Sequence, residues 1–306
     1  MLLDNLHLFL TIAEKGSLVA AARETGMSTT TVSERLAALE THYGVVLFNR
    51  TTRSISLTEE GRVLIDGAKI VLSEVSDLDA RIRHGADTLS GPIRISAPID
   101  IGRSIVSEAI SSFTEEHPAV SIELSLSDGY VDLVGQGFDL AVRFGGVTDS
   151  TLRVRSLGSY QRLVCAAPSY LQKHGTPQRP EDLADHNCLV MRFGETLDNV
   201  WEFGSGANRN QVTVRGSRVV NDGWLIRSWA MAGHGIVLKS ELDVREDVRS
   251  ENLVSFLEEH LPPPNPLQMM FPPGKLRPRR VSAFADCLRS AVPEPRFKTR
   301  IPTRSG

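Results

Sequence analysis

Apolar positions near the start of the chain recur with the period of an α-helix. Side chains at i, i+3, i+4 and i+7 share one helical face, and four apolar residues follow that spacing: Leu6, Phe9, Leu10 and Ala13. Gly16 is expected to end this helix, because glycine readily adopts the left-handed conformation found after a helix C-terminus. Ser17 is a preferred N-cap and predicts a second short helix over residues 18–25.

A third helix is predicted between Ser28, another preferred N-cap, and Gly44. Its apolar positions form one stripe along the helix: Val32, Leu36, Leu39 and Tyr43. Only residues 26–28 separate it from the second helix, and two short helices joined by so tight a turn are typical of a helix-turn-helix. The segments 45–48 and 54–57 have the composition of strands, with NRTTR between them as a hairpin turn, so a wing is expected beside the third helix.

The next segment carries an apolar repeat of seven residues. One set of positions is spaced by seven, and a second set lies four residues after the last three of the first: Leu57, Leu64, Val71 and Leu78, then Ala68, Val75 and Ile82. This pattern, interrupted at Gly61, is typical of a helix that pairs with a partner helix. We predict one long linker helix, capped by Thr58, through which two copies of the chain dimerise. The alternative is a helix packed only on its own domain.

From Gly91 onward, runs rich in strand-forming residues alternate with helical runs, which is typical of an α/β domain. Strands separated by crossover helices predict a parallel sheet. We expect two lobes joined by two crossovers, one of them stiffened by the prolines of segment 262–266. The predicted segments are a winged helix-turn-helix over 1–57, a linker helix over 58–88, a two-lobed α/β domain over 89–292 with lobes of about 92–163 plus 266–292 and about 164–265, and a disordered tail over 293–306.

Composition and charge narrow the class of protein. The chain has 306 residues, enough for roughly two domains of about 150 residues. Its net charge of −3 does not by itself indicate a nucleic-acid or membrane partner. Three cysteines without a CxxC pair favour a reducing compartment over a disulfide framework. Because the N-terminus lacks the pattern of a signal peptide and no run of 18 apolar residues occurs, we predict a cytoplasmic protein without membrane contact.

No catalytic or metal-binding motif is recognisable. The sequence has no HExxH, Walker loop, GxSxG or strand-linked GxGxxG, and its eight histidines lie at no metal-binding spacing. The glycine-rich segment 204–208 is predicted to be a hairpin loop rather than a phosphate cradle, and Cys165 a core residue. We therefore predict neither catalysis nor a cofactor or metal.

The third helix is the candidate DNA-contacting element. In a helix-turn-helix the first residues of the second helix meet the major groove, where serine and threonine hydroxyls bind base edges or phosphates. Arg50 and Arg53 flank Thr51 and Thr52 at the wing tip, and arginines there neutralise phosphates. Residues 1–65 hold six Lys or Arg and seven Asp or Glu, so the positive charge is localised. The alternatives are an ordinary three-helix bundle and a solvated basic turn.

Strand ends in the α/β domain supply candidate ligand-binding residues. In open α/β sheets, ligands lie at the carboxyl ends of strands, near helix N-termini that attract anions. Two lobes joined by two crossovers would place a cleft between them. The candidates are Ser96, Ala97, Pro98, Ile99, Asp100, Ser127, Asp128, Arg143, Asn221, Asp222 and His234. Each of them, taken singly, also fits a loop or cap residue. Arg143 and the helix N-termini favour an anionic ligand such as a carboxylate.

Several motifs resemble those of LysR-type transcriptional regulators. In the first 61 residues these are GS…AA across the first helix pair, S…VS…LE in the third helix, G…LF.R at the wing and LTEEG at the start of the linker helix. In the α/β part they are GPIRIS, GFDLAVRFG, DHNCL over 185–189, WEF over 201–203 and AGHGIVL over 232–238. The resemblance covers residues 5–292.

The resemblance implies a fold and an assembly. It implies a winged helix-turn-helix, a dimerising linker helix and a two-lobed effector-binding domain similar to periplasmic binding proteins. Such regulators assemble as tetramers, and their effectors change DNA bending and the recruitment of RNA polymerase. The residues that resemble base- and phosphate-facing positions are Thr29, Thr30, Thr31 and Ser33, and those that resemble wing contacts are Arg50 and Arg53.

The third helix differs from the family pattern at two points. Family members commonly carry Arg or Lys where this chain has Glu34, which is followed by Arg35. A glutamate can accept a hydrogen bond from a cytosine amino group, or it can simply face Arg35 or solvent. Threonines also replace the Gln-Pro often found near the helix start, so no operator sequence is carried over.

These observations predict a cytoplasmic transcription factor that binds double-stranded promoter DNA and a small effector. Two competing hypotheses remain from other classes. One is a solute-binding protein or an enzyme on the α/β lobes, against which the missing leader and catalytic set argue. The other is an architectural DNA binder with an empty cleft, which melting curves with a metabolite panel would distinguish.

Overall fold

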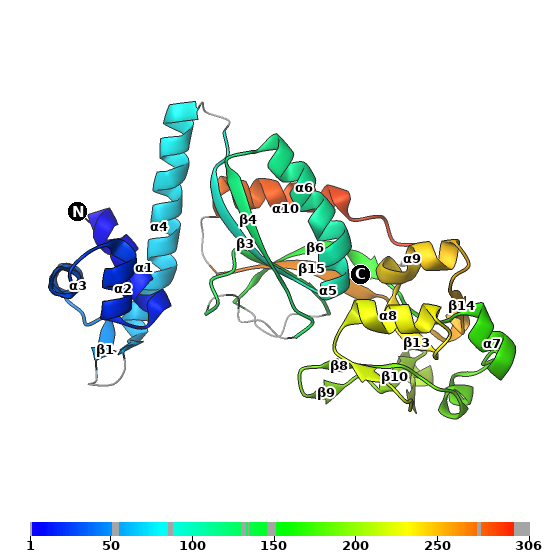
Figure 1. Cartoon of the computed structure of the whole chain (residues 1–306). Helices are drawn as coiled ribbons and strands as arrows, with labels where there is room; N and C mark the ends of the chain where they lie inside the picture. Colours follow the sequence, from blue (N-terminus) through cyan, green and yellow to red (C-terminus); the bar gives the residue numbers. More distant parts are fainter. Residues whose placement is uncertain are drawn as a thin grey trace, which may run out of the picture. The chain divides into compact units, whose positions relative to one another are not determined.

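The computed structural model describes residues 2–50, 55–84, 88–129, 133, 135–145, 151–273 and 277–296 (Figure 1). They form two compact units. The first unit is residues 1–91 with the short segments 117–120 and 274–282, and the second unit is the remainder of the chain.

Three helices open the first unit: α1 (Leu2–Lys15), α2 (Leu18–Thr25) and α3 (Thr29–Tyr43). Their predicted caps are confirmed. Ser28 Oγ accepts a hydrogen bond from the Thr31 N–H at 3.1 Å, and Gly26 ends α2 with a φ of +67°, a conformation that favours glycine. The apolar faces of the three helices meet in one core, whose most deeply buried members are Phe9, Ile12, Val32, Leu36 and Leu39. Tyr43 was predicted to continue this stripe but is 42% exposed, because it lies in the last turn of α3, beyond the core.

The predicted wing is a two-stranded antiparallel hairpin of β1 (Phe48–Arg50) and β2 (Ile55–Leu57). The first strand begins at Phe48 rather than at Val45. The backbone before it is held by the end of α3 instead of a partner strand, since the Val45 N–H donates to the Glu40 carbonyl and the Leu47 N–H donates to the Glu40 carboxylate. The hairpin tip, residues 51–54, lies outside the described residues.

The predicted linker helix is α4 (Glu59–His84), and Thr58 caps it by accepting a hydrogen bond from the Gly61 N–H at 3.0 Å. Its two halves differ in burial. In the first half, Leu64 and Ala68 pack in the core of the three helices. In the second half, the heptad positions Val71, Leu78 and Ile82 are 45%, 53% and 74% exposed. The heptad therefore serves the chain's own core at one end and leaves an uncovered apolar stripe at the other.

The first lobe of the second unit contains a five-stranded sheet in the order β4-β3-β5-β15-β6. Its strands are β3 (Gly91–Ala97), β4 (Val120–Leu126), β5 (Leu140–Phe144), β6 (Arg153–Tyr160) and β15 (Asn265–Phe271). β3 and β5 are parallel as predicted, but β15 runs antiparallel to both β5 and β6. The prediction of a parallel sheet is wrong for this edge, because the chain enters β15 from the second lobe and not through a crossover helix.

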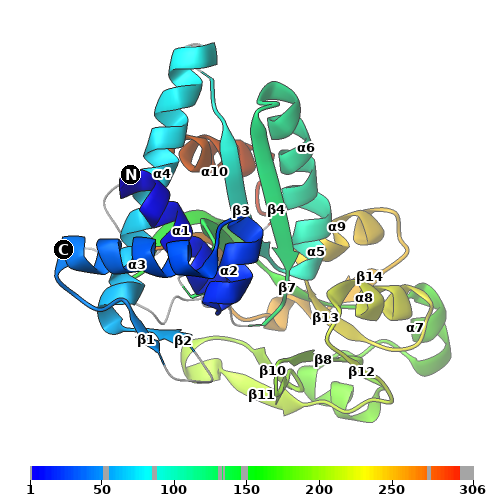
Figure 2. The same ribbon diagram turned by 60° about the vertical axis from the view of Figure 1, so that its left-hand side comes forward.

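Helices cover this sheet in both views of the ribbon (Figures 1 and 2). A short helix, α5 (Ile99–Ile101), follows β3 and continues through a π-helical segment, Gly102–Val106, into α6 (Ser107–Glu116). The last helix is α10 (Arg279–Ala291). Phe113 of α6 packs edge-on against Phe284 of α10 with ring centroids 5.4 Å apart, so the two helices contact one another.

The second lobe is built from three small sheets with strand orders β13-β7-β14, β12-β8-β9 and β10-β11. The strands are β7 (Arg162–Ala166), β8 (Val190–Phe193), β9 (Thr196–Leu197), β10 (Val200–Phe203), β11 (Asn210–Thr213), β12 (Val219–Val220), β13 (Val237–Ser240) and β14 (Val254–Phe256). The helices are α7 (Pro168–His174), α8 (Gly223–Met231) and α9 (Glu241–Arg249), with 3-10 turns at Pro180–Asp185, Gly206–Asn208 and Glu258–His260.

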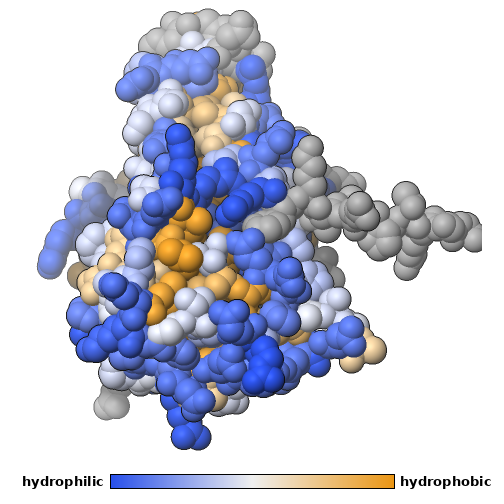
Figure 3. Space-filling view, turned by 90° about the vertical axis from the view of Figure 1, so that its right-hand side faces the viewer, coloured by the Kyte–Doolittle hydropathy of each residue, from blue (hydrophilic) through white to orange (hydrophobic). Residues whose placement is uncertain are grey.

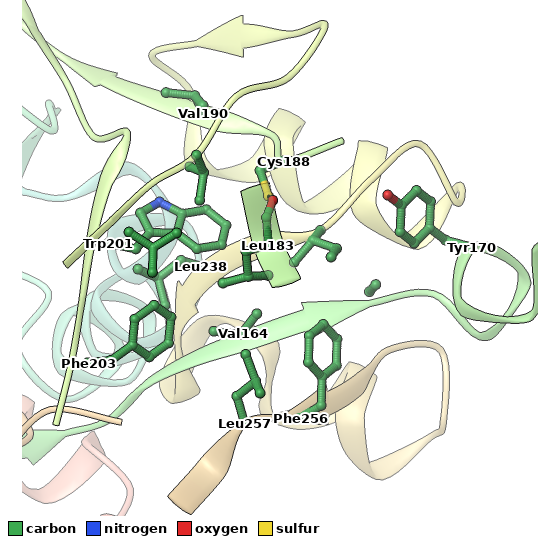
Figure 4. Packing of buried hydrophobic residues seen from close by; sticks show 14 residues of the cluster. Val164, Tyr170, Leu183, Cys188, Val190, Trp201, Phe203, Leu238, Phe256 and Leu257 are labelled. Atoms are coloured by element: carbon green, nitrogen blue, oxygen red, sulfur yellow. The ribbon is translucent and has the colours of Figure 1, made fainter. Parts of the chain in front are cut away.

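An apolar cluster fills the space between these sheets, with Trp201, Phe203, Val164 and Leu238 close together (Figure 4). The Trp201 indole N–H donates to the Asp198 carbonyl at 3.0 Å, so its one polar atom is satisfied. Cys165 is fully buried, as predicted. Segment 204–208 is the loop between the antiparallel strands β10 and β11, which confirms the hairpin prediction.

The run QVTVRGSRVV over residues 211–220 has the composition of one strand, but it does not form a single strand. The chain changes sheets at Gly216, between β11 and β12. A Cβ at Gly216 would collide with the Cys188 carbonyl, so the backbone passes too close to the neighbouring segment for a regular ladder. β12 then pairs with β8 in a parallel register.

The chain passes between the lobes twice, at Gln161 and over residues 262–264. The Gln161 side-chain amide donates to the Pro262 carbonyl at 2.7 Å, so the two crossovers lie side by side. The start of the predicted tail is tied to the second lobe, because the Arg296 N–H donates to the Glu241 carboxylate and Arg245 donates to the Glu294 carbonyl. Residues 297–306 lie outside the described part of the chain.

One face of the molecule shows apolar side chains gathered among hydrophilic ones (Figure 3). Trp224 and Val219 are examples of large apolar side chains that are about half exposed, at 50% and 46%. Within the described ranges, no helix has both the length and the hydropathy needed to cross a bilayer.

Candidate functional site

The start of α3 presents a row of hydroxyl groups. Ser28, Thr29 and Thr30 are exposed, whereas Val32 and Leu36 one turn further along are buried in the three-helix core. The helix is thus held by its apolar face, so the low helix propensity of the threonines is overridden by packing. Its first turn is left to face solvent.

Two of these hydroxyls also build the helix cap. Ser28 Oγ lies 2.8 Å from Thr31 Oγ1 and accepts from the Thr31 N–H. Glu34 is exposed, and Ser33 and Arg35 are half-buried beside it. The residues predicted from the third helix therefore lie together on its first two turns.

The predicted wing contacts are only partly described. Arg50 is the last residue of β1, and nothing beyond its backbone is described. Thr51, Thr52 and Arg53 lie outside the described residues.

A cavity of about 340 Å³ lies between the two lobes of the second unit. Its walls come from the carboxyl ends of β3, β4 and β5, from the β6–β7 crossover, and from β8, β13 and α9. The residues that line it are Pro98, Asp100, Ile101, Asp128, Arg143, Phe144, Gly145, Tyr160, Arg162, Met191, Phe193, Leu238, Lys239, Ser240, Asp243 and Asn265.

Four of the predicted ligand-binding residues line this cavity: Pro98, Asp100, Asp128 and Arg143. Four others lie next to them. Ser96 is fully buried and accepts a hydrogen bond from Arg143 Nη2 at 2.8 Å. The Ile99 N–H donates to Asp128 Oδ1 at 3.0 Å, and Ala97 is buried in the core. Ser127 donates its backbone N–H to the Ala97 carbonyl, which joins the two loops.

The structure does not bring the remaining three candidates into the cavity lining. Asn221 is exposed, and Asp222 caps α8 by accepting from the Leu225 N–H at 2.9 Å. His234 is exposed, and its carbonyl accepts from the Asn187 side-chain amide. Asp222 still lies near the first lobe, because its carboxylate is 3.7 Å from the guanidinium of Arg103.

Lys239 and Asp243 also line the cavity, although they are not among the residues predicted from the sequence. Lys239 Nζ forms an ion pair with Asp100 of the first lobe and a second one, at 3.1 Å, with Asp243 of its own lobe. All three side chains are at most 13% exposed. The available signal was a lysine at the end of an apolar strand, IVLKS, with an aspartate four residues later. Gly223 packs so closely that a Cβ there would collide with Asp100 and Lys239.

Burial changes the ionisation of this cluster. Burial by itself lowers the pKa of Lys239, but the charges of Asp243 and Asp100 and their hydrogen bonds outweigh it, so the pKa is raised. Burial raises the pKa of Asp243 to about 6, and Asp100 adds to that rise against the opposing effect of Lys239. Burial likewise raises the pKa of Asp128. The carboxyl groups of Asp128 and Asp243 therefore hold protons more tightly than exposed aspartates do.

Arg143 is a half-buried cation of a different kind. Its guanidinium donates to the Val142 carbonyl at 2.7 Å and to Ser96 Oγ, both of which are neutral acceptors. Among the described residues no carboxylate oxygen lies within 4.0 Å of it. Burial lowers the pKa of Arg143 to about 10, with Asp128 acting in the opposite direction. Within the described part of the chain, the guanidinium thus lines the cavity without an anion paired to it.

Comparison with known proteins gives matches to two family models. Residues 3–62 match the bacterial regulatory helix-turn-helix proteins of the lysR family, and residues 86–293 match the LysR substrate binding domain. The second match alone covers more than half of the chain, and the two agree with the fold class predicted from the sequence.

Individual proteins give the same answer. The chain is 32% identical over 264 residues to the HTH-type transcriptional regulator DmlR of Escherichia coli strain K12, covering 86% of each protein. It is similar to the structure of CrgA, a LysR-type transcriptional regulator from Neisseria meningitidis, with a TM-score of 0.62, 30% identity and coverage of 94% of this chain and 98% of that one. Full-length LysG from Corynebacterium glutamicum with bound effector Arg has a TM-score of 0.67 at 21% identity over 95% of this chain and 98% of that one, which shows the fold alone.

Proposed function

The chain belongs to the LysR family of transcriptional regulators, and on that basis we propose that α3 contacts the bases of its operator and that the cavity between the lobes holds its effector. The exposed hydroxyls of Thr29 and Thr30 support the first part, because a helix start with short polar side chains fits the major groove. Arg50 and Arg53 at the wing would contact flanking phosphates.

The main support for an effector site in this cavity is that its charged side chains come from both lobes. Asp100, Asp128 and Arg143 come from the first lobe, and Lys239 and Asp243 come from the second. A small molecule in the cavity would touch both lobes at once, so its binding free energy would depend on how far the lobes are closed. Effector binding would in this way change the geometry of the regulator on its promoter.

We propose further that the second half of α4 joins two copies of the chain. Its uncovered heptad positions, Val71, Leu78 and Ile82, form the kind of stripe that pairs in coiled coils. A dimer places two copies of α3 on successive major grooves of a partly palindromic site. Assembly to a tetramer, contact with RNA polymerase and a cytoplasmic location complete the proposal, in which the chain acts by binding and not by catalysis.

Gel shift on the chain's own operator tests the DNA part. We expect Thr30→Ala and Arg50→Ala to weaken operator binding, by about 1–3 kcal/mol where a base contact is lost. Thr41→Ala is the matched control, since Thr41 lies at the other end of the same helix and donates to the Ala37 carbonyl. If both variants bind the operator as tightly as the unmodified chain, the proposed contact surface is wrong.

Thermal melting with a metabolite panel tests the effector part. A ligand that binds the folded chain raises its stability by RT ln(1 + [L]/Kd), about 2.7 kcal/mol at 100 times Kd. The rise should disappear in Arg143→Gln. A rise that survives this substitution would place the ligand elsewhere and contradict the proposed cavity.

A further inference from the structure

Three carboxyl groups and three cations line the cavity, but one of the cations is paired with a carboxylate outside the lining. The carboxyl groups are those of Asp100, Asp128 and Asp243, and the two other cations are Arg143 and Lys239. Arg162 adds no net charge, because it forms an ion pair with Asp198, whose side chain is only 18% exposed. With the Arg162–Asp198 pair set aside and every other group ionised, the described lining carries one excess negative charge.

The excess falls at Asp128. Lys239 is already shared between Asp100 and Asp243, so its ammonium is committed to two carboxylates. Among the described residues, Asp128 accepts a hydrogen bond from the Ile99 backbone N–H and has no ion pair within 4.0 Å. The raised pKa values of Asp128 and Asp243 agree with this shortage of positive charge, because burial and the neighbouring carboxyl groups both favour the protonated acids. Among the described residues, the acidic group of Asp100, Asp128 and Asp243 therefore lacks one cation.

Arg143, by contrast, lacks a close anion among the described residues. Its guanidinium donates to neutral oxygens, those of Ser96 and Val142, although it is half-buried. A guanidinium has five N–H donors in a planar fork that fits a carboxylate, so donors remain for a ligand. Burial lowers the pKa of Arg143 to about 10, as expected for a desolvated cation without a close counter-ion.

We propose that the ligand of this cavity is a small zwitterion, with its carboxylate bound by Arg143 and its cationic nitrogen bound by Asp128 beside the Asp100–Lys239–Asp243 cluster. The proposal rests on the proposed function, in that it takes this cavity as the effector site. Ile101, Phe144, Met191, Phe193 and Leu238 line the rest of the cavity and would contact a short apolar body.

The same charges disfavour simpler ligands. A dicarboxylate would bring a second negative charge to the acidic side, where like charges repel. A simple amine would leave Arg143 buried without an anion. The expected ligand therefore carries both charges and is not the simple anion that the sequence favours.

Calorimetry on the full chain with matched compounds tests this class. The probes are neutral α-amino acids, and for each its deamino carboxylic acid and its decarboxylated amine, together with C4 and C5 dicarboxylates. We expect at least one amino acid to bind about 10- to 100-fold more tightly than both of its truncated analogues, since each lost charge-assisted hydrogen bond costs about 1.5–3 kcal/mol. Tighter binding of a deamino acid or a dicarboxylate overturns the proposal, and so does a panel without any binding.

Variants assign the two ends of the ligand. Asp128→Asn should weaken amino-acid binding about 10- to 100-fold and leave any binding of the deamino acid unchanged, whereas Arg143→Gln should weaken both. Asp128→Glu keeps the charge and should restore part of the affinity. Asp185→Asn, an exposed acid in the second lobe, is the control and should change nothing. Equal affinity for the amino acid in Asp128→Asn overturns the assignment, and a urea unfolding curve for each variant shows that it is folded.

A proton measurement adds a readout independent of affinity. At pH 6, binding of a ligand cation should release protons from the acidic cluster, which appears as a difference in heat between buffers of unlike ionisation enthalpy. No release in the unmodified chain contradicts the contact. If dicarboxylates bind and Arg143→Gln abolishes that binding, the cavity remains the effector site and only the zwitterion is wrong. If ligands bind with no dependence on Arg143, the proposed function itself fails.

Discussion

The start of α3 and the cavity between the lobes use polar side chains in opposite ways. On α3 they are exposed, and the cap bond joins Ser28 to Thr31, three residues away. In the cavity they are buried, and Lys239 is paired with Asp100, which lies 139 residues away in the sequence. Substitution of an exposed polar side chain changes the free energy of unfolding little. Substitution of a buried ion-paired side chain changes it strongly, because its partner is left buried without a counter-charge. Substitutions at the start of α3 should therefore change DNA binding with little effect on stability. Substitutions in the buried cluster of the cavity should change stability as well as ligand binding.

The largest expected effect is on the buried cluster. Lys239→Met would leave Asp100 and Asp243 facing each other without their cation, and breaking a buried ion pair costs about 3–5 kcal/mol. All three tryptophans, Trp201, Trp224 and Trp229, lie in the second lobe, so their fluorescence during urea unfolding reports the loss. Lys173→Met, an exposed lysine on α7, is the control.

The triple variant Lys239→Met, Asp100→Asn, Asp243→Asn sharpens this prediction. It removes the charges together, and replacing a whole buried ion cluster is often close to neutral. It should therefore recover much of the lost stability. A single variant that is less than about 1 kcal/mol destabilised, the range of an exposed pair, would show that the cluster is not a buried unit.

The next effect concerns pH. The pKa of Asp243 is raised to about 6 by burial, above its ordinary value of 3.8, so the folded chain binds this proton more tightly than the unfolded chain. Its contribution to stability is therefore largest below about pH 4 and is lost as the pH rises to about 6, by at most about 3 kcal/mol.

Asp243→Asn tests this sign. The difference in unfolding free energy between the unmodified chain and the variant should fall from pH 4 to pH 6 and then stay level above that. The opposite slope would mean that Lys239 dominates and holds the pKa of Asp243 below its ordinary value. An exposed acid such as Asp185, replaced by Asn, supplies the baseline.

A smaller effect is expected at the cap of α3. Ser28→Ala removes the acceptor of the Thr31 N–H, and loss of such a cap costs about 1 kcal/mol. Ser28→Asp, which also caps helices well, should keep most of the stability but weaken operator binding, because it places a negative charge near phosphate. Thermal unfolding measures the stability of each variant, and gel shift measures its operator binding. If stability and operator binding fell together in both variants, the cap and the DNA contact could not be assigned separate effects.

The smallest expected change in stability is at Glu34. It is exposed on the second turn of α3, so Glu34→Ala should change the unfolding free energy by no more than about 0.5 kcal/mol. Selection from a random DNA library should nevertheless yield a different preferred base at one position of each half-site, if the carboxylate accepts from a cytosine amino group. An unchanged preference would leave Glu34 as a solvated charge.

Local signals explain why so much of the first unit could be predicted. The caps at Ser17 and Ser28, the stop at Gly44 and the apolar stripe of Val32, Leu36 and Leu39 all act within a few residues. The register of the wing was less predictable, because Glu40 of α3 holds the backbone at Leu47. The division of α4 into a packed half and an uncovered half also depends on contacts with other helices, which a heptad pattern does not contain.

The α/β alternation, the family motifs and four cavity residues at strand ends can be predicted from the sequence, because strand ends and helix caps are local features. Long-range packing, by contrast, inserts β15 antiparallel between β5 and β6 and brings Lys239 across to Asp100. It also left Asn221 and His234 outside the lining. These contacts join residues that are far apart along the chain. The charge balance of the cavity is set by side chains from two lobes, and a local sequence pattern does not show which of these side chains contact one another.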